Sequence, residues 1–164
     1  GESPDPALIA KITETVLNHK MVIGVHDIVV HDYGPGRRIV SLHAEVPYNK
    51  DMMEVHDLMD HIEMRLMEEY HCEATIHMDP VVTDDEEVNE TRKEVFNIVK
   101  KYDKTLSVHD FRMVKGPTHT NVIFDLVIPY GKDYEPEKIV KDLKQKIKDE
   151  MQGKHYAVIR VDRF

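Results

Sequence analysis

The segment "ATIHMDP" (74–80) recurs near the other end of the chain as "AVIRVDR" (157–163). Two further segments recur in the same order. They are "IGVHDIVVHDYG" (23–34), which matches "LSVHDFRMVKG" (106–116), and "RIVSLHAEVPYNKD" (38–51), which matches "TNVIFDLVIPYGKD" (120–133). Three matches in one order, each about 82 residues apart, rarely arise by chance. The sequence therefore predicts a tandem duplication.

Each copy is predicted to form a domain, over residues 1–82 and 83–164. Stretches with apolar residues at helical spacing are interspersed with stretches in which every second residue is apolar, such as 40–46. Each copy is therefore expected to run helix, strand, strand, helix, strand. The expected helices span about 5–19, 51–70, 86–102 and 135–151, and the expected strands span about 22–31, 38–46, 72–80, 106–115, 120–129 and 155–163.

This order of elements predicts the α+β class. A three-stranded sheet with two helices on one face is an open sandwich, so its other face stays available for solvent, a ligand or another sheet. A unit of about 80 residues is only marginally stable alone, and packing two copies together would stabilise both.

The charges and histidines are unevenly distributed. Residues 1–82 hold 6 Lys and Arg against 15 Asp and Glu, whereas residues 83–164 hold 16 of each, and 8 of the 11 histidines lie in the first half. An acidic, histidine-rich half suits cations, although a merely well-solvated surface has the same composition. A nucleic-acid-binding protein would instead carry a basic stripe. The single cysteine, Cys72, excludes a disulfide scaffold.

Three potential metal ligands are predicted to lie on the free face of the first sheet. Strand alternation places His43, His77 and Asp79 there, all exposed, and two imidazoles with a carboxylate suit a borderline divalent ion. His26 shares its parity with apolar neighbours and would point inward. Either the regular strand starts after His26, or a bulge turns it, or it is a buried histidine. Taken singly, each histidine is more often a surface residue than a ligand.

Four segments of the first copy, taken together, resemble a known family. "GVHDIVV", "LHAEV", "VHDLMDHIE" and "TIHMDP" are similar, in this order, to the cytoplasmic C-terminal domain of cation diffusion facilitators. The resemblance covers residues 23–80 and extends less closely to the second copy. It implies a ferredoxin-like, metallochaperone-like αββαβ fold. It also implies a domain that dimerises and binds metal, and so regulates an antiporter that exports Zn²⁺, Mn²⁺, Fe²⁺ or related ions against protons.

The resemblance also implies a ligand set in the first copy. The residues at the matching positions are His26, His43, His56, His77 and Asp79. His56 would be able to bridge two ions.

The second copy departs from this pattern and is expected to be degenerate. It keeps His109 and Asp162, but Asp125 stands where the first copy has His43, and Arg160 stands in place of His77. Because a guanidinium carries a permanent positive charge, it repels a cation. We expect His109, Asp125 and Asp162 to be vestiges of a site that binds no metal. Apolar residues predicted to be exposed on this face indicate a packing surface; they are Ile123, Val127 and Val158.

The expected function is that of a regulatory, divalent-metal-binding and dimerisation domain of a proton-coupled exporter. The expected ion is Zn²⁺, with Mn²⁺, Fe²⁺ or Co²⁺ as alternatives. The expected partners are a transmembrane domain of the same transporter and either a second copy of the chain or the second unit acting as an internal partner. The chain would be a soluble fragment of a protein at the cytoplasmic face of the membrane. The alternative is a metal-independent assembly module with relic histidines.

A small metal-dependent enzyme is a further alternative, which we do not expect. Glu45 lies on the same strand face as His43 and could serve as a general base. The sequence, however, has no nucleophile elbow, no phosphate loop and no His-Glu-x-x-His helix.

Overall fold

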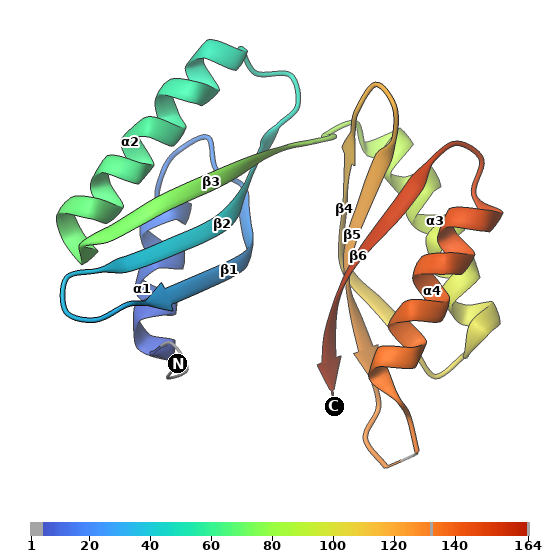
Figure 1. Ribbon diagram of the computed structural model, residues 1–164. Coiled ribbons are helices and arrows are strands. Elements are labelled where there is room, and N and C mark those ends of the chain that lie inside the picture. The colour runs from blue at the N-terminus through green and yellow to red at the C-terminus, as the bar shows by residue number, and fades with distance from the viewer. Residues whose placement is uncertain (1–4, 132, 164) are drawn as a thin grey trace. The chain divides into compact units, whose positions relative to one another are not determined.

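The computed structural model describes residues 5–131 and 133–163, and these residues form two compact units that divide after Pro80 (Figure 1). The first unit contains α1 (Pro6–Leu17), β1 (Gly24–Asp32), β2 (Arg38–Pro47), α2 (Met52–Tyr70) and most of β3 (Cys72–Val81). The second unit contains α3 (Asp85–Tyr102), β4 (Ser107–Lys115), β5 (Thr120–Ile128), α4 (Pro136–Glu150) and β6 (His155–Arg163). The predicted order of elements is confirmed in both units.

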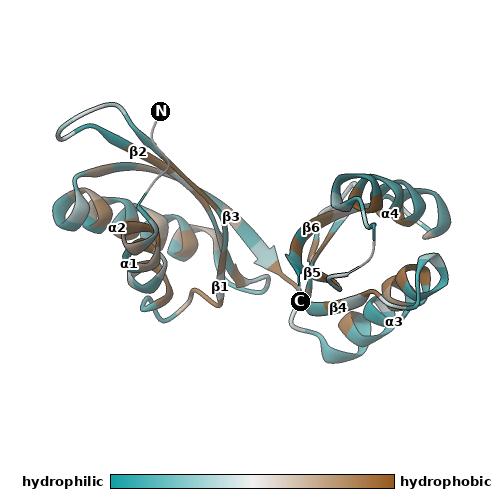
Figure 2. Cartoon of the chain, turned by 90° about the horizontal axis from the view of Figure 1, so that it is seen from below, coloured by the Kyte–Doolittle hydropathy of each residue, from teal (hydrophilic) through white to brown (hydrophobic). Residues whose placement is uncertain are grey.

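In the first unit, three strands form a sheet with helices on one face. Strand β2 lies between β1 and β3, and β1 runs antiparallel to β2. Helices α1 and α2 cover one face of this sheet (Figures 1 and 2). Val40, Leu42 and Ala44 of β2 are buried in the core that the sheet forms with these helices. Burying this apolar stripe stabilises the unit, by roughly 1.5–3 kcal/mol for each fully buried large side chain. Among residues 5–80, no helix covers the opposite face of the sheet.

The second unit repeats this plan. Strand β5 pairs antiparallel with β4 and parallel with β6. Helices α3 and α4 cover one face of the sheet (Figure 2). Phe124, Leu143 and Ile147 form part of the buried core between sheet and helices. Two ferredoxin-like αββαβ units therefore make up the chain, and the predicted α+β class is confirmed.

The helix starts follow from local capping. Asp51 precedes α2, and its side chain accepts a hydrogen bond from the backbone N–H of Glu54, at 3.3 Å. Asp84 does the same for Glu87 at the start of α3, at 3.1 Å. Each cap satisfies a backbone donor that the first turn of a helix leaves without an intrahelical partner. Helices α1 and α4 begin at a proline, whose missing N–H costs nothing at that position.

The segment 81–87, which connects the two copies, is already structured. Val81 pairs with Val114 of β4, and the backbone N–H of Val82 donates to the carbonyl oxygen of Met113 at 2.9 Å. Helix α3 then begins at Asp85. The connection between the two copies is therefore short.

Both units carry the same β-bulge in their first strand. One extra residue lies between His26 and Val29 of β1, relative to the paired segment of β2, and Asp27 has a φ of 50°. Strand β4 has the same irregularity after His109, with Asp110 at a φ of 52°. Aspartate tolerates this left-handed backbone better than most residues. The bulge explains why both copies have an aspartate at this point.

The prediction that Ile123, Val127 and Val158 are exposed on the second sheet is wrong for Ile123. Ile123 is only 4% exposed, whereas Val127 and Val158 are half-buried.

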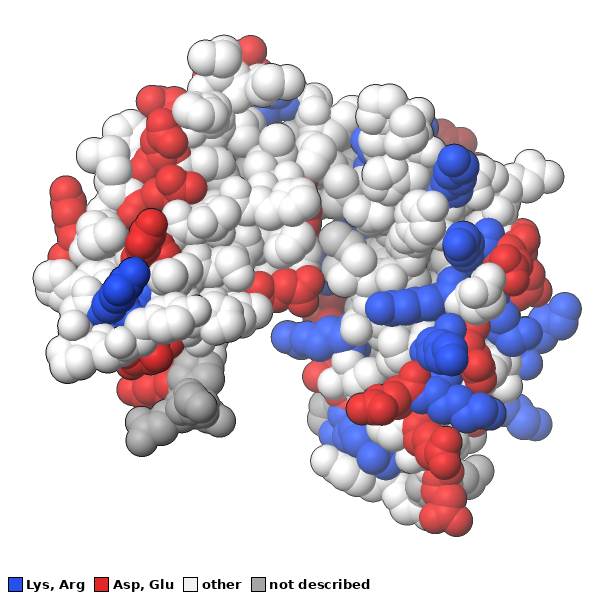
Figure 3. All heavy atoms as spheres, viewed as in Figure 1, with Lys and Arg blue, Asp and Glu red and all other residues white. Residues whose placement is uncertain are grey.

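The charge difference between the copies is visible on the molecular surface, where basic side chains gather on the second unit (Figure 3).

Candidate metal centre

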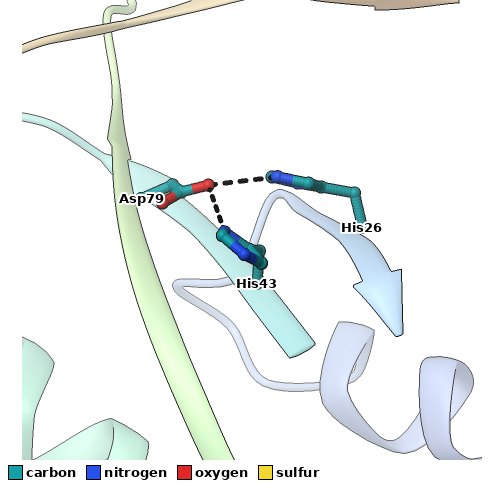
Figure 4. A group of neighbouring side chains, drawn as sticks. All are labelled: His26, His43 and Asp79. Carbon is teal, nitrogen blue, oxygen red and sulfur yellow. Dashed lines mark hydrogen bonds and ion pairs between the residues drawn. The ribbon is translucent and has the colours of Figure 1, made fainter. Parts of the chain in front are cut away.

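Three of the predicted ligands meet on the helix-free face of the first sheet. His26 of β1, His43 of β2 and Asp79 of β3 each offer one ligand atom, and these atoms all lie within 4.8 Å of one another (Figure 4). The two histidines are direct partners across the β1–β2 ladder, where paired side chains are close neighbours. Side chains from three adjacent strands therefore converge on one point.

Asp79 lies at the centre of this cluster. Its Oδ2 atom is 3.2 Å from Nε2 of His26 and 3.1 Å from Nδ1 of His43. Asp79 is only 7% exposed, so the prediction that it stands free in solvent is wrong. Burial by itself would raise the pKa of Asp79, but the hydrogen bonds and positive charge of His26 and His43 outweigh it and lower this pKa. The carboxylate is thereby kept ionised and able to bind a cation.

His77 lies at the mouth of the cluster. Its side chain is 68% exposed, and its Nε2 atom is 3.5 Å from Oδ1 of Asp79. The ring of His43 stacks between the rings of His26 and His77, with centroid separations of 4.7 and 4.5 Å. His77 thus lies next to the cluster on its solvent side, although it is not among the three residues whose ligand atoms converge.

The bulge in β1 decides the direction of His26. With one extra residue at Asp27, the alternation of β1 shifts by one position across the bulge. Val25 and Ile28 pack against the core on one side, while His26 points to the other side, toward His43. Of the three options that the sequence left open for His26, the structure has the bulge.

His56, the fifth predicted ligand, does not join the cluster within the described residues of this chain. It lies on the exposed face of α2, where its Nδ1 atom is 3.7 Å from Oδ2 of Asp60. A similar pair, His61 and Asp57, lies beside it, at 3.3 Å. The helix and the free face lie on different sides of the sheet, so no side-chain rotation within one chain would bring His56 to Asp79.

Glu45 contacts the cluster, which the sequence did not lead us to expect. It was considered only as the general base of an enzyme, yet its carboxylate is 2% exposed and its Oε2 atom is 3.0 Å from Nδ1 of His26. Strand alternation does place Glu45 on the same face as His43 and opposite the start of β1. That signal could have shown its proximity to His26 but not its burial.

The two carboxylates determine the protonation of His26. Burial alone would lower the pKa of its imidazole, but the hydrogen bonds to Asp79 and Glu45 and their negative charges outweigh burial and raise the pKa of His26 to about 9. Without a metal ion, His26 is protonated at neutral pH and donates from both ring nitrogens. A divalent cation can replace the proton on Nε2, because both are positive charges facing Asp79.

The donor set fits a borderline divalent ion. Ligands bound tetrahedrally to Zn²⁺ at about 2.0–2.2 Å are about 3.3–3.6 Å apart. The two nitrogen–oxygen separations at Asp79, 3.1 and 3.2 Å, are already close to this spacing. Imidazole nitrogen with carboxylate oxygen and no thiolate is a set that Zn²⁺ and neighbouring transition metals accept.

The corresponding positions of the second unit hold an ion pair. Nη2 of Arg160 is 2.9 Å from Oδ2 of Asp125 and 3.6 Å from Oδ2 of Asp162. Asp125 is 6% exposed, and its pKa is raised, first by burial, despite the adjacent guanidinium. His109 is exposed. Among the described residues of the second unit, no three metal-ligating side chains lie close enough together to hold an ion.

The chain thus has two ferredoxin-like domains in tandem, and the first has a histidine and aspartate cluster on its open sheet face. The family model for the cation efflux protein, cytoplasmic domain, matches the chain twice, over residues 4–81 and 88–164. The chain belongs to this family, and the predicted resemblance is confirmed. Among the described residues, no helix is long and apolar enough to cross a membrane.

The individual proteins compared with this chain each match about half of it. An uncharacterized transporter of Methanocaldococcus jannaschii, MJ0449, is 40% identical over 82 residues, which are 49% of this chain and 29% of the relative. The chain thus spans less than a third of that transporter. Two structures of a candidate zinc transporter, CzrB, one of them in a zinc form, are each 26% identical. They cover 48% and 49% of this chain and 98% and 92% of their own, with TM-scores of 0.43 and 0.42.

Proposed function

We propose that the first unit binds one divalent cation and that this binding regulates and assembles a cation exporter of which the chain is the cytoplasmic part. The observation that carries the proposal is the convergence of Nε2 of His26, Nδ1 of His43 and Oδ2 of Asp79. His77 completes the donor set from the solvent side. Zn²⁺ is the first candidate, because CzrB is described as a candidate zinc transporter; Mn²⁺, Fe²⁺ and Co²⁺ accept the same donors.

The ion would regulate through linkage between binding and conformation. Its ligands come from three strands and thus hold β1, β2 and β3 in one arrangement. A ligand that binds only that arrangement stabilises it by about 2.7 kcal/mol when its concentration is one hundred times Kd. A rising metal concentration would therefore shift the domain toward the ordered state. A transmembrane exporter joined to the domain would respond to this change.

His56 remains a predicted ligand in this proposal, in a different setting. Because it faces solvent on α2, it would coordinate an ion only together with groups from outside this arrangement, such as a second copy of the chain. Loss of metal-induced dimerisation on His56→Ala, with unchanged metal binding by the monomer, would support that role.

The second unit is proposed to contribute to assembly without metal. The guanidinium of Arg160 already supplies the positive charge beside Asp125 and Asp162. This observation favours a metal-independent assembly role for the second unit alone. Pairing of the second unit with the first, or with another chain, remains part of the proposal.

The proposal assigns no catalytic step to the site. A hydrolytic metal centre needs a general base that can reach a substrate or a water molecule. Glu45, the acid that the sequence offered for this role, is buried and bonded to His26. It is therefore poorly placed to serve as that base.

Matched variants at equivalent positions of the two units test the proposal. His26→Ala should abolish binding of Zn²⁺, measured by isothermal titration and by metal analysis of the purified chain. His109→Ala, the same change at the same bulge of the second unit, should leave binding unchanged. Equal metal content in both variants would overturn the proposal, provided that both retain the circular dichroism spectrum of the wild type.

A further inference from the structure

We propose that Glu45 is a positioning residue of the metal centre, which holds Nδ1 of His26 so that only Nε2 faces the ion. The inference rests on the metal site of the proposed function and adds a residue that does not itself bind the metal. Three independent features of the first unit carry it: the contact between Glu45 and His26, the space that Gly24 leaves for Glu45, and the change of both residues in the second unit.

The contact is directional. Oε2 of Glu45 is 3.0 Å from Nδ1 of His26, while Nε2 at the other end of the same ring is 3.2 Å from Asp79. A neutral imidazole carries one N–H and one lone pair. When Nδ1–H donates to Glu45, the lone pair lies on Nε2, which faces the other donors. Ligating histidines commonly donate their second N–H to a carboxylate in this way, which fixes the ring and raises its basicity.

Gly24 provides the room for this contact. A Cβ atom at position 24 would lie 2.7 Å from Oε2 of Glu45 and 2.9 Å from its Cδ. Such distances are far below van der Waals contact, so any larger residue would displace the carboxylate that holds His26. The backbone of Gly24 lies outside the left-handed region. The glycine is thus explained by space rather than by conformation.

The second unit lacks this arrangement. The cross-strand pair Gly24–Glu45 of the first unit corresponds to Ser107–Val127 in the second. The same unit has Asp125 at the position of His43 and Arg160 at that of His77. The buried carboxylate and the glycine beside it are therefore present in the copy that has the ligand cluster and absent from the copy that has lost it. A purely structural requirement of the fold would apply to both copies.

Substitution of Glu45 should weaken metal binding in a graded way. Loss of a carboxylate that orients a ligating histidine typically lowers metal affinity by about 10–100-fold. Glu45→Gln keeps the shape and still accepts from Nδ1–H but has no charge, so its Kd for Zn²⁺ should rise by about tenfold. Glu45→Val copies the second unit and offers no acceptor, so its Kd should rise by about one hundredfold. The control, Glu68→Gln, removes an exposed carboxylate from α2 and should leave Kd unchanged.

The experiment measures Kd for Zn²⁺ by chelator competition in the full chain and records ¹⁵N spectra of the imidazoles in the zinc-loaded protein. In the wild type, the His26 ring should show a protonated, solvent-protected Nδ1 and a zinc-bound Nε2. That proton should exchange rapidly in Glu45→Val. A change that only loosens the fold would not act selectively on this proton. Gly24→Ala provides a second route, because it displaces Glu45 without altering its chemistry and should also raise Kd.

The possible results separate this inference from the proposed function. If Glu45→Gln and Gly24→Ala bind Zn²⁺ with wild-type affinity and keep the protected Nδ1 proton, Glu45 has no positioning role, although the metal site stands. If His26→Ala binds as tightly as the wild type, the site itself is wrong and the inference falls with it. Should Glu45→Val fail to fold, the Gln and Ala variants still decide the question.

Discussion

The two units of this chain are built alike but balance the negative charge of the free sheet face differently. Both have the order αββαβ, and both have a bulge with an aspartate in the left-handed conformation. In the first unit, the imidazole of His26 faces the buried Asp79. In the second unit, the permanently charged guanidinium of Arg160 faces the buried Asp125. A buried carboxylate needs a positive partner in either case, and only the first unit has a partner that can be exchanged.

The largest expected effect concerns pH in the absence of metal. His26 has a pKa of about 9 in the folded chain against about 6.5 when unfolded, so its stabilising contribution is complete below pH 6.5 and is lost as pH rises to 9. The loss should be on the order of 3 kcal/mol in the first unit. Urea unfolding in EDTA across this range would measure it, and His26→Gln should remove the dependence. The second unit should show none, because its guanidinium does not titrate there.

The next effect concerns the metal-dependent stabilisation of the first unit. Asp79→Ala should eliminate the rise in melting temperature that Zn²⁺ produces in the wild type. That rise corresponds to about 2.7 kcal/mol at a hundredfold excess over Kd. Asp162→Ala, the equivalent change in the second unit, should retain the full rise. Thermal melts with EDTA and then with Zn²⁺ make the comparison, and a rise that survives Asp79→Ala would refute the assigned ligand.

A smaller effect is expected when the built-in cation of the second unit is removed. Arg160→Ala leaves Asp125 buried without its ion-pair partner, and this should cost about 2 kcal/mol. The exposure of the Arg160 side chain, 72%, keeps the cost below that of a fully buried pair. Arg160→Lys should recover part of the loss. Urea unfolding at pH 7 tests both variants, and an unchanged midpoint for Arg160→Ala would show that the ion pair contributes nothing.

The smallest effect concerns the shared bulge. A valine in the left-handed conformation is strained, so Asp27→Val and Asp110→Val should each destabilise the chain by about 1–2 kcal/mol. Glycine at either position should be tolerated. Only the change at Asp27 should also weaken binding of Zn²⁺, because only that bulge directs a ligand. Equal effects on Kd from both positions would show that the bulge does not orient His26.

Much of the fold could be predicted because it depends on local patterns. Each helix has apolar residues at helical spacing and most have a cap, and the strand of His43 alternates cleanly. The predicted ends lie within about two residues of the observed ones for nearly every element. The duplication could also be recognised from the sequence, since whole segments recur in the same order. The family followed from the same segments.

The candidate site was predictable only in part. His43, His77 and Asp79 could be placed on one face because alternation is regular in β2 and β3. The direction of His26 could not, because a bulge shifts alternation by one residue and the sequence does not show where the register slips. The burial of Asp79 and Glu45 was also missed, since burial depends on neighbours from other strands. Whether these side chains bind a metal is still a prediction.

The sequence by itself determined that the chain contains two copies of one unit, which helices and strands each copy has, and which residues lie on each regular strand. These properties depend on spacing along the chain, and periodicity records spacing directly. Only the tertiary structure decided that His26 turns toward Asp79, that Glu45 holds the far side of that ring, and that Arg160 closes the equivalent place in the second unit. Such contacts join residues that are far apart in the chain, 19 residues for His26 and Glu45 and 35 for Asp125 and Arg160, and their geometry is set by register and burial rather than by local pattern.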